Sequence, residues 1–178
     1  MTDDPFPFGS GGYWLMFALL LTARGMDFLS TWVATPNLVL EGNPLAKKLG
    51  WKLGGLVNLG ICFGFAFWPL TAIIISTTGF LVAAHNFQSA WLMRTMGEEA
   101  YANWFVDQIH QTPTALFLGC LLGETGLTAL IGVALICFSR EDSVAFSIGI
   151  GMAAFAVVVL FFTCLSLWRM RRGRKRRI

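Results

Sequence analysis

Four ionisable side chains stand within long apolar stretches of this sequence, namely Arg24, Asp27, His85 and Glu124. If those stretches cross a bilayer, each charge costs at least about 2.5–3.5 kcal/mol on insertion scales, which makes these residues functional candidates. Arg24, Asp27 and Thr31 are spaced i, i+3 and i+7, so they share one face of a helix. Arg24 and Asp27 could neutralise each other as a structural pair, or they could belong to a site.

Polar residues on four expected helices have a similar depth. At about 1.5 Å per residue, Asp27, Asn58, His85 and Glu124 lie about 9–15 Å from the same end of their helices. In a compact bundle, four helices could point these side chains at a common centre. With their neighbours they form a predicted polar layer: Arg24, Asp27, Thr31, Asn58, His85, Gln88, Ser89 and Glu124.

The chemistry of the polar layer favours cations or protons. Histidine and carboxylate ligands together suit a hard or borderline divalent cation, so a divalent metal ion is the candidate cofactor. Its candidate ligands are Asp27, Glu41, His85 and Glu124. The same groups could relay a proton, since imidazole titrates near neutrality. His85 could equally be a residue that hydrogen-bonds between two helices.

The segment Glu41-Gly42-Asn43-Pro44 predicts an ordered turn. Pro44 has no N–H to donate and pushes Asn43 away from the helical conformation, while Gly42 permits a tight bend. The turn holds a carboxylate and an amide near the end of the helix that carries Asp27. Two interpretations remain open: the turn covers the entrance to a site at Asp27, or it only caps the following helix.

Two short motifs occur in the first half of the chain: Asp27-x-x-x-Thr31 and Glu41-x-Asn43-Pro44. Over about residues 12 to 96, the chain resembles a family of small uncharacterised prokaryotic integral membrane proteins with a D-x-x-x-T and E-x-N-P signature. The resemblance implies that the five motif residues act as one unit. It implies no particular reaction.

The composition places these residues in a bilayer. Of 178 residues, 56% are hydrophobic and only 13% charged, against roughly a quarter charged in a soluble domain. Such values exclude a disordered chain, a disulfide-stapled secreted module and a soluble nucleic-acid-binding domain. We expect an all-α polytopic membrane helical bundle that forms one domain over residues 1–178. Its five transmembrane helices are predicted at 12–33, 51–68, 70–94, 114–138 and 143–168.

The apolar stretch between Trp51 and Met96 is too long for one span and must turn. Either Trp68-Pro69 or the polar cluster 76–79 could form the turn. We place it at Trp68-Pro69, because proline is well tolerated in the first turn of a helix. Between the third and fourth spans, an amphipathic pattern predicts a short interfacial helix at 97–110, docked onto the bundle.

Seven of the thirteen basic residues lie in the last ten positions, the basic tail 169–178. A basic cluster next to a span fixes topology and attracts anionic lipid headgroups, so we expect anionic membrane lipid as its partner and no nucleic acid. Lys47, Lys48 and Lys52 would lie on the same side of the membrane. The positive-inside rule then predicts an outside N-terminus and a cytoplasmic C-terminus, in a prokaryotic cytoplasmic membrane.

Three functions fit these patterns. The first is binding or translocation of a cation or proton by a small transporter or channel-like protein, which would need to form a homo-oligomer because five helices rarely enclose a gated path. The second is an accessory or assembly subunit bound to another membrane protein. The third is a metal-dependent, membrane-embedded enzyme acting on a lipid or a membrane-anchored substrate. No recognised catalytic motif favours the third, and catalytic residues stay unassigned.

Overall fold

The computed structural model describes residues 4–139 and 143–174, and for residues 169–174 it describes the helical backbone only. In these ranges the chain forms six helices and no strand: α1 Gly11–Ala34, α2 Pro44–Phe65, α3 Pro69–Met96, α4 Glu98–Gln111, α5 Thr114–Phe138 and α6 Ser143–Arg174. The all-α prediction is therefore confirmed for the described residues. The basic tail 169–178 was expected to follow the last span, but its first part continues α6 as helix.

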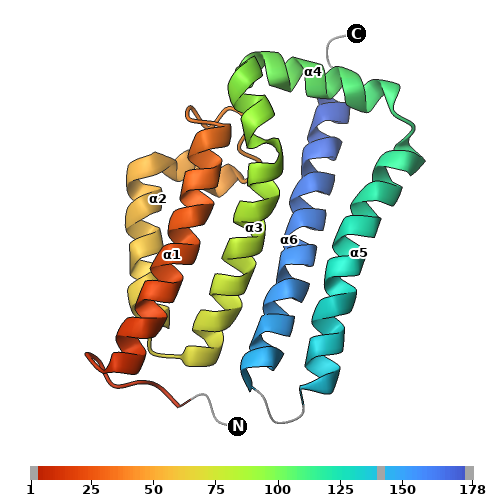
Figure 1. The fold of residues 1–178 in the computed structure, drawn as a ribbon. Coiled ribbons are helices and arrows are strands. Elements are labelled where there is room, and N and C mark those ends of the chain that lie inside the picture. Colours follow the sequence, from red (N-terminus) through yellow and green to blue (C-terminus); the bar gives the residue numbers. More distant parts are fainter. Residues whose placement is uncertain (1–3, 140–142, 175–178) are drawn as a thin grey trace.

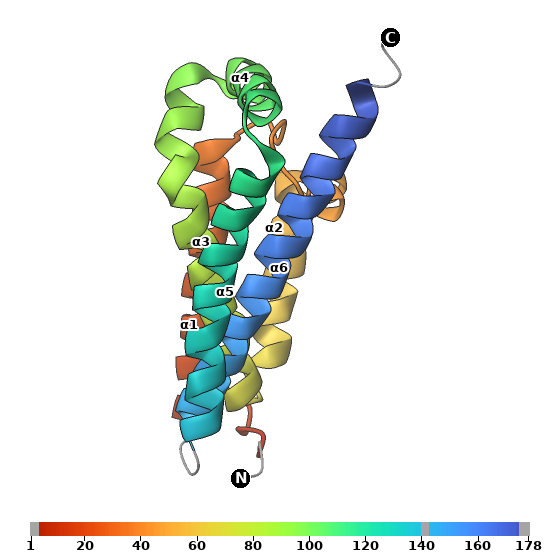
Figure 2. The same cartoon turned by 90° about the vertical axis from the view of Figure 1, so that its right-hand side faces the viewer.

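The five long helices run roughly along one axis, and α4 lies across one end of them (Figure 1). α1 packs against α3, α3 against α6, and α6 against α5, so that these four helices form a row. α2 lies beside α1 at the edge of that row, and Figure 2 shows α2 and α6 displaced to the same side. The predicted interfacial helix thus exists as α4, and it crosses the ends of the bundle.

Three described helices, α3, α5 and α6, are long and apolar enough to cross a bilayer. Many large apolar side chains on the outer surface are exposed, among them Leu127 and Phe161. Such a surface suits acyl chains rather than water. The chain is thus an integral membrane protein, whereas the membrane placement of 12–33 and 51–68 stays a prediction.

The turn between α2 and α3 lies where the sequence places it. α3 begins at Pro69, directly after Trp68, and continues as helix through residues 76–79. α2 differs more, because it begins at Pro44 instead of Trp51. Gly50 interrupts it with a φ of 63°, a conformation that glycine adopts without steric cost. The predicted start at Trp51 therefore coincides with the second, uninterrupted part of α2.

Glycine residues allow α6 to approach both of its neighbours closely. A Cβ added to Gly132 of α5 would lie 2.7 Å from the carbonyl oxygen of Gly149, and one added to Gly151 would lie 2.9 Å from that of Ile74. The Thr78 hydroxyl also donates to the Gly151 carbonyl at 3.0 Å. α6 is therefore fixed between α3 and α5, and it determines how far apart their polar residues lie.

Candidate functional site

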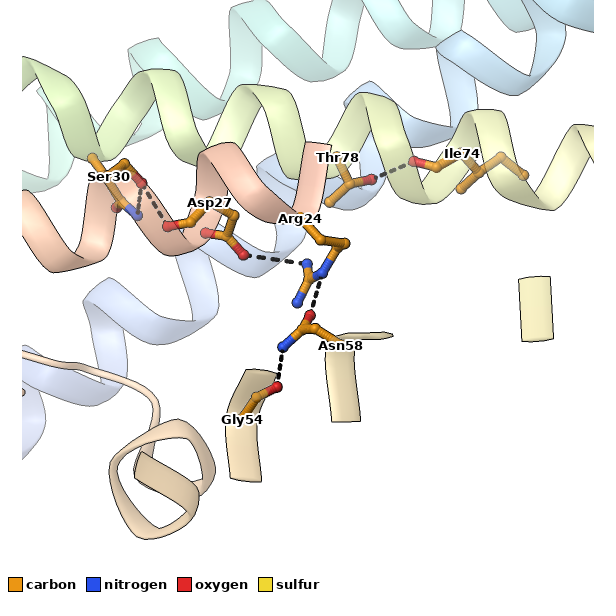
Figure 3. A network of polar contacts seen from close by, with 8 residues as sticks. Arg24, Asp27, Ser30, Gly54, Asn58, Ile74 and Thr78 are labelled. Carbon is orange, nitrogen blue, oxygen red and sulfur yellow. Dashed lines mark hydrogen bonds and ion pairs between the residues drawn. The ribbon is translucent and has the colours of Figure 1, made fainter. Parts of the chain in front are cut away.

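Arg24, Asp27 and Asn58 form one polar cluster between α1 and α2, here called the arginine cluster (Figure 3). Arg24 Nη1 lies 3.2 Å from Asp27 Oδ2, as the i, i+3 spacing predicts. Arg24 Nε donates to Asn58 Oδ1 at 2.5 Å, and Asn58 Nδ2 donates to the Gly54 carbonyl at 2.8 Å. Both charged side chains are mostly buried, with 26% of Arg24 and 19% of Asp27 exposed.

A second set of bonds attaches this part of α1 to α3. The Ser30 hydroxyl donates to the Asp27 carbonyl at 2.8 Å, and Asn86 Nδ2 donates to the Ser30 hydroxyl at 3.3 Å. Thr31 is half-buried one turn after Asp27, and its carbonyl accepts a hydrogen bond from the Thr35 N–H. The Asp27 turn is thus held from both sides of α1.

The turn before α2 acts as a helix cap. Glu41 Oε1 accepts from the Asn43 N–H at 2.7 Å, and Asn43 Oδ1 accepts from the Leu45 N–H at 2.9 Å. Pro44 occupies the first turn of α2, as its missing N–H allows. The turn therefore caps α2, and closure of a site above Asp27 stays a prediction.

His85 and Glu124 form a separate polar contact between α3 and α5, here called the histidine–glutamate pair. His85 Nδ1 lies 2.8 Å from Glu124 Oε1. The two side chains are 34% and 42% exposed, more than those of the arginine cluster. Phe155 of α6 presents its ring edge-on to the imidazole, with the centroids 6.2 Å apart. The neighbouring Gln88 is exposed and Ser89 is half-buried.

The polar layer does not converge on one centre. Asp27 and Asn58 meet through Arg24, whereas His85 and Glu124 meet each other. Gly79 of α3 faces Ala23 of α1. An α-helix turns by about 100° per residue, so His85, six residues later, points about 240° further around α3 and away from α1. Shared depth therefore did not imply a shared direction, since α3 points its polar residues to two sides.

The candidate metal ligands are divided in the same way. Asp27 is bonded to Arg24 and Glu41 to the turn before α2, while His85 and Glu124 belong to the other cluster. Within residues 4–139 and 143–174, no three His, Cys, Asp or Glu side chains are grouped closely enough to hold a metal ion. The arrangement offers two pairs of charges instead of one coordination shell.

The sequence interpretation missed Glu98, which is 9% exposed at the start of α4. One carboxylate oxygen accepts from the Asn37 N–H at 2.8 Å, and the other accepts from the Val39 N–H at 3.1 Å and the Thr35 hydroxyl at 3.0 Å. Trp51 Nε1 bonds the Pro36 carbonyl of the same loop at 2.8 Å. Glu98 thereby fixes the loop that leads from α1 to the Glu41 turn.

These hydrogen bonds also determine the acidity of Glu98. Desolvation alone would raise its pKa, but the N–H groups of Asn37 and Val39 and the Thr35 hydroxyl outweigh this effect and hold the pKa below its ordinary value. A glutamate in the first turn of a helix was the available signal, because it suits the positive end of the helix dipole. Its partner loop depends on Leu38, whose φ is 57°.

No family model matches the chain, and neither a curated protein nor a solved structure is significantly similar to it.

Proposed function

We propose that this is a membrane protein of five spans, with α1 and α2 joining the three apolar helices in the bilayer and α4 at the cytoplasmic surface. α1 has 24 residues, about 36 Å of helix, which is enough to cross the hydrocarbon core. The Arg24–Asp27 ion pair reduces the cost of placing two charges there. Lys47, Lys48 and the basic tail then lie on the cytoplasmic side, with the N-terminus outside.

The proposed function is proton exchange across this membrane, carried by the histidine–glutamate pair. The observation that supports it is the 2.8 Å contact between His85 Nδ1 and Glu124 Oε1. Imidazole can accept a proton on one ring nitrogen and release one from the other, and a carboxylate beside it can hold the proton between transfers. Both side chains are partly exposed, so the helix packing does not enclose the pair completely.

The arginine cluster has a different proposed role. The Arg24 guanidinium lies 3.2 Å from the Asp27 carboxylate and forms an ion pair with it. A second cation beside Asp27 would therefore meet a positive charge. We assign this cluster to holding α1 and α2 together, and proton transfer to His85 and Glu124.

The test is proton flux into proteoliposomes that contain the purified protein and an internal pH-sensitive dye. Glu124→Gln and His85→Gln should each reduce the flux at least tenfold, because each removes one titrating group and keeps a hydrogen-bonding side chain. Glu99→Gln is the matched control, since Glu99 is exposed on α4. Flux in the His85 and Glu124 variants equal to that of the control would refute the proposal.

A second candidate function, assembly with another membrane helix, is supported by the outer surface of α5. α5 packs mainly on α6, and Glu124 remains 42% exposed although it lies in the middle of the helix. A carboxylate in lipid seeks a further donor, which a second copy of the chain could provide. Cys120 is exposed one turn away, so oxidative cross-linking in native membranes should give a dimer that Cys120→Ser abolishes. A chain that stays monomeric would exclude this candidate.

A further inference from the structure

Phe155 of α6 lies beside the histidine–glutamate pair. Its side chain is only 4% exposed, and its ring is inclined at 71° to the imidazole of His85, with the two centroids 6.2 Å apart. Aromatic rings that are nearly perpendicular attract each other, because the edge of one ring is positive and the face of the other is negative. The His85 ring is thus contacted both by the Glu124 carboxylate and by the Phe155 ring.

The position of Phe155 is fixed by the packing of three helices. It forms a buried apolar cluster with Leu121 of α5 and Val159 of α6. Gly151, one turn earlier on α6, lies so close to α3 that an added Cβ would be 2.9 Å from the Ile74 carbonyl oxygen. Phe155 is therefore held between α3 and α5, and it offers the imidazole a fixed surface.

The imidazole of His85 needs such a constraint to keep one orientation. The torsion χ2 that turns a histidine ring is broad and roughly two-fold, so the side chain alone does not select an orientation. A carboxylate can only accept, so the hydrogen in the contact with ionised Glu124 is on Nδ1 of neutral His85. Nε2 is then the nitrogen that can bind another proton, which forms a second N–H bond and gives an imidazolium.

We propose that Phe155 is a positioning residue, which holds the His85 ring with Nδ1 on Glu124 and leaves Nε2 as the nitrogen that takes up a proton. Its importance for proton flux rests on the proposed proton exchange, whereas its effect on the ring does not. Perpendicular aromatic contacts favour one arrangement by a factor of about two to ten. Loss of the Phe155 ring should weaken the preference for one tautomer of His85 by about that factor.

Nitrogen NMR of the full-length protein, isotopically labelled in its histidine rings, tests the orientation directly. The chain contains only two histidines, and His110 is exposed on α4 and serves as an internal reference. At a pH at which both rings are neutral, we expect His85 to be predominantly the Nδ1–H tautomer. Phe155→Leu should populate the Nε2–H tautomer as well, and it should lower proton flux into proteoliposomes by about two- to tenfold.

Val159→Ala is the matched control, because Val159 is 6% exposed in the same apolar cluster, one turn after Phe155. It opens the core but keeps the ring beside His85, so the tautomer and the flux should stay unchanged. An Nδ1–H tautomer that survives Phe155→Leu in protein with unaltered circular dichroism, or an equal change in Val159→Ala, would overturn the proposal. So would a mixture of the two tautomers in the unaltered chain, which requires no variant to fold.

The positioning role and the proposed proton exchange can fail separately. An unaltered chain that has no proton flux, but whose His85 tautomer depends on Phe155, would refute the proton exchange and support the positioning role. Flux that depends on Glu124 but not on Phe155, with an unchanged tautomer, would refute the positioning role alone.

Discussion

The arginine cluster and the histidine–glutamate pair both join two ionisable side chains, but they hold them in different ways. Arg24 is bonded to Asp27 on its own helix and to Asn58 on α2, so its charge is fixed and neutralised. His85 and Glu124 have each other as partners across two helices and remain more exposed. The bonded guanidinium makes the arginine cluster a structural connection between α1 and α2. The histidine–glutamate pair joins two side chains that the proposed proton exchange could use.

This difference predicts the largest loss of stability at Arg24. Arg24→Leu leaves the Asp27 carboxylate mostly buried without its cation, which should cost about 3–5 kcal/mol of unfolding free energy. The double variant Arg24→Leu/Asp27→Leu should recover most of that loss, because it removes both charges together. Thermal unfolding in detergent, followed by circular dichroism, measures both. A double variant as unstable as the single one would show that the cluster is more than a neutralised pair.

An intermediate effect is expected at Glu98, which anchors the loop above the arginine cluster. Glu98→Ala leaves the Asn37 and Val39 N–H groups without their acceptor and should cost about 1–3 kcal/mol. The folded-state pKa of Glu98 is lowered, so its stabilisation is fully present above the unfolded-state pKa of about 4.3. It is lost as the pH falls through the lower folded-state value.

Unfolding measured at pH 6 and at successively lower pH values tests this linkage. The unaltered chain should lose the contribution of Glu98 on acidification, and Glu98→Gln should lose none at that position. Glu99→Gln serves as the control because it changes an exposed glutamate on the same helix turn. Identical acid profiles for the two glutamine variants would contradict the assigned role of Glu98.

The smallest stability effect should come from the histidine–glutamate pair, despite its proposed importance for function. Polar contacts between membrane helices contribute about 0.6 kcal/mol on average, so Glu124→Gln should unfold almost like the unaltered chain. Measuring both thermal unfolding and proton flux for the variants then distinguishes the structural role of the arginine cluster from the functional role of the histidine–glutamate pair. A loss above about 2 kcal/mol would place Glu124 with the structural residues and erase the contrast with Arg24.

Several features could be predicted from the sequence because their causes are local. The i, i+3 spacing of Arg24 and Asp27 predicts their ion pair, and Pro69 predicts the start of α3. The pairing of His85 with Glu124 is compatible with their shared depth, but the separation of the polar layer is not predictable from depth alone. That separation depends on the rotation of α3, which is set by its packing against Ala23.

The role of Glu98 was hidden for a different reason. Its partners in the 35–40 loop lie about sixty residues earlier in the chain, and the loop contains Leu38, which takes a positive φ. A left-handed leucine is rare enough that no propensity rule predicts it. The sequence therefore indicated α4 itself but gave no reason to connect it with the loop before α2.

α4 is the covalent link between the helices α1–α3 and the pair α5–α6, and it lies across their ends (Figure 1). Through Glu98 it also holds the loop that continues into Glu41. Gly97 and Pro113 lie on either side of α4, so its orientation relative to α3 and α5 is set at these two residues. In mechanical terms, α4 is a crossbar that joins the loop before α2 to the start of α5.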